Sequence, residues 1–318
     1  MVYLITGGTG HVGARISRDL VREGHRVVVY EMIPDHTRLE GLLNTDERSM
    51  VQMVKGDVLD FEFLMETIKA NGVDSIIHLA AVLFEAIKVK PRWATMVNAD
   101  GTLNVFEAAR LLGLTKVVWA SSNAVFAAGA PSEEPTANDA PHYPWGPYGA
   151  AKSFGERISD FYFEEYGVDI TATRYGGFIY GALQERGGSG TITRQVMLNP
   201  AVGKAGVVPW GDDTVGWIYV DDAARAAVLA CKHRRVKRGA FNIPGHVHLV
   251  REVVGFVKEI IPEADIKVEP GKMAFATGWK LDGQAAEEEF GYRPLWSIKQ
   301  GIRETINMER RLNGLPQI

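Results

Sequence analysis

A glycine-rich turn near the N-terminus is the feature that most constrains how this chain folds. In the stretch YLITGGTGHVGARI, a β-branched run leads into a turn and then into apolar residues at helical spacing, and the turn glycines are Gly7, Gly10 and Gly13. Glycines suit this place because the chain turns tightly, its N–H groups approach a pyrophosphate and the helix packs closely on the sheet. The pattern predicts a dinucleotide-binding strand–turn–helix unit, with His11 and Val12 beside the phosphates.

Strands and helices alternate through the first 175 residues. We expect strands at 2–6, 26–31, 50–57, 75–81, 116–122 and 169–175, and helices at 12–23, 61–71, 91–112 and 148–166. Short β-branched strands that alternate with longer helices predict a parallel sheet with helices on both faces. The fold class is therefore α/β, a Rossmann-type doubly wound parallel sheet.

The alternation ends after Tyr175, where the sequence becomes rich in glycine and irregular. We therefore expect a dinucleotide-binding domain over residues 1–175, with a return segment near 215–235. Residues 176–318 are expected to form mainly a smaller C-terminal lobe that binds the substrate.

The overall composition excludes several classes of function. The formal net charge of −4 provides no basic field for nucleic acid, and no run of 18 apolar residues indicates a membrane span. Cys231 is the one cysteine, so the chain forms no internal disulfide and no cysteine-based metal site. We expect a cytoplasmic protein with no metal ion.

An acidic residue, Glu31, ends the second expected strand. A carboxylate there accepts hydrogen bonds from the ribose hydroxyls of adenosine and repels a 2′-phosphate. No Arg or Lys stands at Met32 or Ile33, although Arg38 could fold back toward a phosphate. The pattern favours NAD over NADP.

Seven motifs in order resemble the extended short-chain dehydrogenase/reductase superfamily, which includes nucleotide-sugar epimerases and dehydratases. They are TGGTGHVG, GDVLD, IHLAA, NADGTLNVFEAAR, WASSNAVF, YGAAK and WIYVDDAARA, and they span nearly the whole chain. The resemblance implies further contacts with NAD at Asp57, Val58, Leu79, Ala80, Ala81, Asn98, Tyr148 and Lys152. Asn98 would open a helix, as a cap or as part of a proton path. We also count Tyr175 among the cofactor contacts.

The pair Tyr148 and Lys152 carries the predicted chemistry. A tyrosine with an ordinary pKa of about 10 is a poor base near neutrality, and a lysine one helical turn away would favour the phenolate. Tyr148 is then the general acid/base, and Lys152 tunes it and holds the nicotinamide ribose. Ser122, at the end of a strand, donates to the substrate oxygen.

Other polar residues have simpler explanations. His78 lies in a buried strand and is expected to be a core residue, and His246 and His248 lack a convincing metal-site spacing. Asp221 and Asp222 are expected to be structural. The resemblance implies a homodimer that pairs the helices near 98–112 and 148–166.

The substrate remains open between two classes. Nucleotide-sugar enzymes of this superfamily usually carry an arginine where this chain has Val215, and an RYFN element where it has RYGG. Arg186 or Arg194 could replace that arginine. The stretches SSNAVF and RYGGFIYG, with a loop at 187–193, loosely resemble short-chain L-threonine dehydrogenases.

We therefore expect an NAD-dependent oxidoreductase acting on a small secondary alcohol or a sugar-like hydroxy substrate. The alternatives are a nucleotide-sugar epimerase or dehydratase with tightly bound NAD, and a non-catalytic dinucleotide sensor. The expected substrate contacts are Phe84, Glu85, Ser122, Asn123, Phe178 and Thr191.

Overall fold

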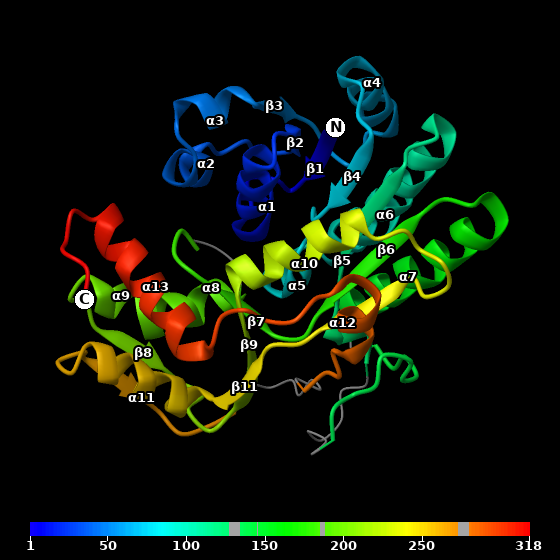
Figure 1. Cartoon of the computed structure of the whole chain (residues 1–318). Helices are drawn as coiled ribbons and strands as arrows, with labels where there is room; N and C mark the ends of the chain where they lie inside the picture. Colours follow the sequence, from blue (N-terminus) through cyan, green and yellow to red (C-terminus); the bar gives the residue numbers. More distant parts are fainter. Residues whose placement is uncertain (127–133, 145, 185–187, 273–279) are drawn as a thin grey trace.

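Seven parallel strands form the central sheet of the protein (Figure 1). The computed structural model describes residues 1–126, 134–144, 146–184, 188–272 and 280–318. The strands are β1 (Val2–Thr6), β2 (Arg26–Glu31), β3 (Val51–Lys55), β4 (Ser75–His78), β5 (Lys116–Ser122), β6 (Ile170–Tyr175) and β10 (Ala240–Ile243). Their order in space is β10-β6-β5-β4-β1-β2-β3. The strand order reverses between β1 and β4, and sheets of this kind bind ligands at the carboxyl ends of the strands beside that point.

Helices cover both faces of the sheet, as the alternating pattern predicted. On one face, α1 (His11–Arg22) packs against α10 (Val220–Lys232), and their core includes Ile16, Leu20 and Val228. The other face carries α4 (Phe61–Asn71), α6 (Pro91–Leu112) and α7 (Gly146–Tyr166), with α5 (Phe84–Val89) leading into α6. The short helices α2 (Thr37–Leu42) and α3 (Thr45–Ser49) connect β2 to β3.

The ends of these helices follow from local sequence. The Asp60 carboxylate accepts the backbone N–H of Phe63 and caps α4. Gly72 and Gly113 adopt left-handed backbone angles where α4 and α6 end. Pro91 occupies the first turn of α6, where its missing N–H costs no hydrogen bond.

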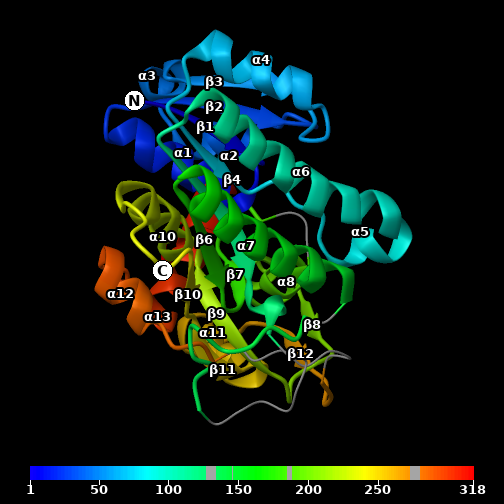
Figure 2. The same cartoon turned by 90° about the vertical axis from the view of Figure 1, so that its right-hand side faces the viewer.

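A smaller lobe lies below the carboxyl ends of the sheet in Figure 2. Its strands are β7 (Phe178–Tyr180), β9 (Thr214–Tyr219) and β11 (His246–Leu249) in one sheet, and β8 (Gly206–Val208) and β12 (Ile266–Val268) in another. Its helical segments are α8 (Gly188–Thr193), the π-helix η2 (Arg194–Leu198), α9 (Asn199–Ala201), α11 (Val250–Ile260) and α13 (Ile298–Leu312). Trp217, Val254 and Ile302 are buried at the centre of this lobe. Helix α12 (Gln284–Phe290) packs near β10 instead.

The predicted return to the main sheet occurs later than expected. The expectation of a return near 215–235 is wrong for its first part, because β9 pairs with β7 and β11 in the small sheet. Helix α10 covers the main sheet, and β10 is the strand that joins it, beside β6. Two predicted strands are also shorter, since β3 ends at Lys55 and β4 at His78. The division into domains at residue 175 stays a prediction.

Candidate active site

The glycine turn has the shape that a bound pyrophosphate requires. Gly7 has a φ of +69°, which favours glycine, and a Cβ there would lie 2.9 Å from the backbone nitrogen of Ala80. A Cβ at Gly13 would lie 2.6 Å from the carbonyl oxygen of Gly7. Because these positions carry no side chains, a phosphate can approach the backbone of the turn at the N-terminus of α1, where an anion is favoured. These residues fit the predicted dinucleotide.

Glu31 lies beside this turn, as the prediction of a ribose-binding acid requires. Its carboxylate accepts a hydrogen bond from the hydroxyl of Thr9 at 3.0 Å. Arg38 folds back toward the turn, where its guanidinium donates to the carbonyl oxygens of Thr9 and Leu183. The guanidinium of Arg38 therefore has backbone carbonyl oxygens as its partners in this structure.

His11 faces the segment that leads into the smaller lobe. Its Nε2 lies 3.2 Å from the carbonyl oxygen of Ala182. Burial and the charges of Arg15 and Arg38 hold the pKa of His11 well below its usual value. The imidazole of His11 is therefore neutral at pH 7. The next residue, Val12, packs against the cores of both lobes.

The predicted adenine and dinucleotide contacts lie at neighbouring strand ends. Val58 is buried beneath Gly101 of α6, and its carbonyl oxygen accepts from Asn104. The carboxylate of Asp57 accepts the backbone N–H of Leu59, which shapes the turn after β3. Leu79, Ala80 and Ala81 follow β4 directly and are half-buried. Their contacts with NAD stay predictions.

Asn98 does not open a helix, so that expectation is wrong. Helix α6 begins at Pro91, and Asn98 lies two turns inside it with its side chain buried. Its amide donates to the carbonyl oxygen of Val82 at 2.9 Å and accepts the N–H of Val82 at 2.7 Å. Asn98 therefore fixes the segment that follows β4, and a direct contact with NAD stays a prediction.

Ser122, Tyr148 and Lys152 come together where β5 ends and α7 begins. The hydroxyls of Ser122 and Tyr148 are hydrogen-bonded to each other. The Lys152 ammonium donates to the carbonyl oxygen of Ala120 at 2.7 Å and lies 5.6 Å from the centre of the Tyr148 ring. Tyr148 stands in the first turn of α7, as predicted. The three predicted catalytic residues are thus neighbours, while their roles stay predictions.

The protonation of this group differs from the expectation that Lys152 lowers the pKa of Tyr148. Burial raises the pKa of Tyr148 to about 12, and the hydrogen bond to Ser122 opposes only part of that rise. Burial also lowers the pKa of Lys152 to about 8, against the attraction of the Glu156 carboxylate. The net shift is upward because desolvation of the phenolate outweighs the hydrogen bond to Ser122, and the tuning of Tyr148 by Lys152 stays a prediction. Tyr148 is therefore a protonated phenol at neutral pH.

The remaining predicted residues occupy varied positions. Asn123 is buried in the short 3₁₀ turn after β5, Phe178 is half-buried on β7, and Thr191 is exposed on α8. The hydroxyl of Tyr175 donates to the carbonyl oxygen of Ala223 on α10. The side chains of Phe84 and Glu85, and all of Arg186 and Gly187, lie outside the described residues; Arg194 is exposed on η2. Contacts of these residues with substrate or NAD stay predictions.

Sequence analysis missed a buried ionic cluster behind the catalytic group. Glu156, one turn after Lys152, is 3% exposed and pairs with Arg174 of β6, which is 6% exposed. The hydroxyl of Ser121 donates to the same carboxylate, and His142 lies 3.4 Å from it. The signal in the sequence is an arginine near the end of the expected strand ITATRY, which needs an acid as its partner when it is buried.

His78 and Asp222 make hydrogen bonds within the fold, which agrees with the expected structural roles of these two residues. Both ring nitrogens of His78 are hydrogen-bonded to threonines, at 2.6 Å to Thr6 and 3.1 Å to Thr102. Asp222 accepts the backbone N–H groups of Leu295 and Trp296. Across the described residues, no cluster of three His, Cys, Asp or Glu side chains is arranged to hold a metal ion.

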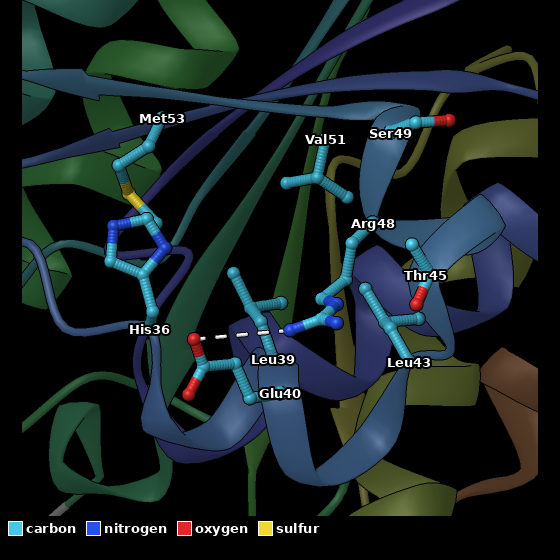
Figure 3. Close-up of a pocket in the computed structure, with 9 residues that line it drawn as sticks. All are labelled: His36, Leu39, Glu40, Leu43, Thr45, Arg48, Ser49, Val51 and Met53. Carbon is cyan, nitrogen blue, oxygen red and sulfur yellow. Dashed lines mark ion pairs between the residues drawn. The ribbon is translucent and has the colours of Figure 1, made fainter.

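A surface pocket of about 350 Å³ lies away from this site, under the edge strand β3 (Figure 3). Its lining comes from α2, α3 and β3, and comprises His36, Leu39, Glu40, Leu43, Thr45, Arg48, Ser49, Val51 and Met53. Arg48 reaches across it to Glu40 at 3.9 Å. The lining includes none of the predicted catalytic or cofactor residues.

The comparison with known families agrees with this geometry. A model described as the NAD dependent epimerase/dehydratase family matches residues 3–244, which is most of the chain. The chain belongs to this family. It is an NAD-dependent enzyme of the extended short-chain dehydrogenase/reductase type, which confirms the predicted superfamily, fold class and cofactor.

Relatives of this family member include two kinds of enzyme. A UDP-glucose 4-epimerase from Mycolicibacterium smegmatis is 29% identical over 96% of this chain and 98% of that enzyme. A mitochondrial L-threonine 3-dehydrogenase from Bos taurus is 26% identical over 96% of this chain and 81% of that enzyme. The solved UDP-glucose 4-epimerase of Thermus thermophilus, a complex with NAD, has a TM-score of 0.83 and 26% identity over 98% of this chain and 99% of that one.

Proposed function

We propose that the protein is an oxidoreductase that transfers a hydride between NAD and a small secondary alcohol or a sugar-like hydroxy substrate. Bound NAD would supply the acceptor for the hydride that leaves the carbinol carbon. In the direction of reduction the phenol of Tyr148 would give its proton to the carbonyl oxygen, and in the direction of oxidation its phenolate would take the proton of the substrate hydroxyl. Ser122 would donate a hydrogen bond to the same oxygen. Lys152 supplies the nearby positive charge that a phenolate needs.

The contact between Gly177 and β9 supports a small substrate over a nucleotide sugar. Gly177 stands where an RYFN element carries its asparagine, and a Cβ there would lie 2.2 Å from the carbonyl oxygen of Gly216. The backbone therefore leaves no space for an asparagine side chain. Val215, at the position of the usual arginine, is fully buried in the core of the smaller lobe. A diphosphate would lack both of these partners, and an unpaired anion in a cleft is costly.

A nucleotide-sugar epimerase or dehydratase is the second candidate. The name of the Mycolicibacterium smegmatis relative supports it, with 29% identity along nearly the whole chain. Tyr148, Ser122 and Lys152 would serve this reaction equally, because an epimerisation returns the hydride to the same substrate. The two candidates differ in whether NADH accumulates.

The test is to incubate the protein and NAD with hydroxy amino acids, sugar acids and polyols, and to follow NADH. We expect NADH from at least one member of the panel, and a Tyr148→Phe variant to lower that rate by about 10²- to 10⁴-fold. Turnover of UDP- or dTDP-sugars alone, without net NADH, would favour the second candidate. Full activity in Tyr148→Phe would contradict the role of Tyr148.

We also propose a cytoplasmic location, which the single cysteine supports. In the described part of the chain, no helix combines the length and the apolar character needed to cross a membrane. The partner is a small-molecule substrate, and the net charge of −4 gives no support for nucleic acid.

A further inference from the structure

Three side chains on one face of α7 hold three consecutive residues of β5. Tyr148 is hydrogen-bonded to Ser122, and Lys152 donates to the carbonyl oxygen of Ala120. One turn further on, Glu156 accepts the hydroxyl of Ser121 at 2.5 Å. Since these side chains are four residues apart, they form one row along the helix. The two predicted catalytic side chains of α7 are thus in line with a carboxylate.

The Glu156 carboxylate is fixed by charged and polar groups from other elements. Arg174 of β6 donates from Nε at 2.8 Å and from Nη2 at 2.6 Å. His142 lies at 3.4 Å from the carboxylate and is itself paired with Ser153 at 2.9 Å. Removing one partner of such a buried pair leaves an uncompensated charge, so the carboxylate is held in place.

The surroundings of Lys152 make Glu156 the acid that acts on its charge. The ammonium lies 5.2 Å from the centre of the Trp119 ring on β5, and burial favours its neutral form. From β4 it faces His78, which burial keeps neutral by lowering its pKa to about 3. Tyr148 is a neutral phenol, and Arg174 of β6 is already paired. The attraction of Glu156 opposes the loss of the proton from Lys152.

Acids on the packed helix α6 are committed elsewhere. Glu107 of α6 pairs with Arg110 and accepts the hydroxyl of Tyr162, about three turns beyond Lys152. On α7 itself, Asp160 pairs with Arg235 at 2.6 Å.

We propose that Glu156, anchored by Arg174 and Ser121, is a positioning residue that fixes the place and the positive charge of Lys152 beside Tyr148. The inference rests on the proposed role of Lys152 in hydride transfer. Glu156 is buried one turn beyond Lys152 on α7, and it acts through the lysine.

The test measures the titration of Lys152 directly by NMR in protein labelled with ¹³C-lysine, from about pH 6 to about pH 11. The Cε resonance of Lys152 is assigned by its loss in a Lys152→Met variant. In a Glu156→Gln variant we expect the midpoint to move to lower pH by about one unit. A Glu164→Gln variant, which changes an exposed acid on the same helix, should leave the midpoint unchanged.

A second variant covers the case in which Glu156→Gln alone fails to fold. Replacing the pair together, as Glu156→Gln with Arg174→Met, removes both buried charges and avoids an unpaired arginine. The midpoint of Lys152 should fall in this variant by less than in Glu156→Gln, because the loss of the Arg174 charge opposes the loss of the carboxylate. A midpoint that stays at the wild-type pH in a folded variant of either kind would overturn the proposal, because a structural role alone changes stability without changing the lysine.

The kinetic measurement separates this inference from the proposed function. With a substrate that yields NADH, the pH profile of kcat/KM in Glu156→Gln should shift in the same direction as the Lys152 midpoint. If the midpoint moves and no substrate yields NADH, the proposed function fails and the link between Glu156 and Lys152 stands. If the midpoint is unchanged and the wild-type enzyme yields NADH, the proposed function stands and the inference about Glu156 fails.

Discussion

Lys152 is enclosed by protein, and its burial makes stability depend on pH. Its pKa falls from 10.5 to about 8 because burial disfavours the ammonium. Between these two pH values the unfolded state binds more protons than the folded state. The contribution of Lys152 to the free energy of unfolding therefore rises with pH over this range.

We predict that a Lys152→Met variant loses this component of the pH dependence. The free energy of unfolding of the wild type, minus that of the variant, should increase from about pH 8 toward about pH 10, and by at most about 3 kcal/mol over the full window. Urea denaturation at a series of pH values provides the measurement. Tyr148 acts in the opposite direction only above pH 10, because its raised pKa of about 12 keeps the folded phenol protonated. A constant difference between the two proteins would contradict the lowered pKa.

At the scale of elements, the close approach to β9 of Gly177, the residue just before β7, depends on glycine. A Cβ at Gly177 would lie 2.2 Å from the carbonyl oxygen of Gly216. This neighbour is backbone in a paired strand, which shifts less easily than a side chain. We predict that Gly177→Ala destabilises the protein by about 2 kcal/mol or more, as overpacking does in a rigid core. Thermal and urea unfolding measure the change.

Gly255 offers a matched control for this substitution. It lies on an exposed face of α11, and a Cβ there would meet no atom within 4 Å. Gly255→Ala should be neutral or stabilise the protein by up to about 1 kcal/mol, because alanine favours a helix. If Gly177→Ala were as stable as Gly255→Ala, the space at position 177 would be large enough for a side chain, and the argument against nucleotide sugars would weaken.

The elements of the main sheet could be predicted because their signals are local. The spacing of Ile16 and Leu20, the cap at Asp60 and the glycine at Gly72 each lie within the segment that they define. The small sheets gave weaker signals, since β7 and β8 have three residues each and pair with distant strands. For the same reason β10 was not recognised as the strand that returns to the main sheet.

Some residues of the candidate site could also be predicted from local sequence, while others could not. The Tyr148 and Lys152 pair follows from spacing along one helix, and Ser122 follows from its place at a strand end. The pairing of Glu156 with Arg174 depends on β6 lying beside β5 under α7, which no local pattern encodes. The raised pKa of Tyr148 likewise comes from burial by the assembled fold.

At the scale of the whole molecule, α6 and α7 lie side by side (Figure 2). Both helices also expose large apolar side chains. The exposed ones are Leu111 of α6 and Phe154, Phe161 and Tyr166 of α7, and we refer to them as the α6–α7 patch. Phe161 is 48% exposed and packs edge-on against Tyr166 at 5.7 Å. A second copy related by a two-fold axis would cover this patch with the same patch, which supports the predicted homodimer.

We predict that the wild-type protein sediments at twice its chain mass of 35.0 kDa and that Phe161→Glu shifts it to the single-chain mass. A carboxylate in the centre of an apolar interface loses its hydration without gaining a partner, so association should weaken by several kcal/mol. Val236→Glu, at a residue that is 78% exposed and outside the patch, should leave the mass doubled. Analytical ultracentrifugation across a range of concentrations decides the outcome. A wild-type protein with the single-chain mass at every concentration, or a Phe161→Glu variant that remains doubled, would show that the α6–α7 patch is not the contact between copies.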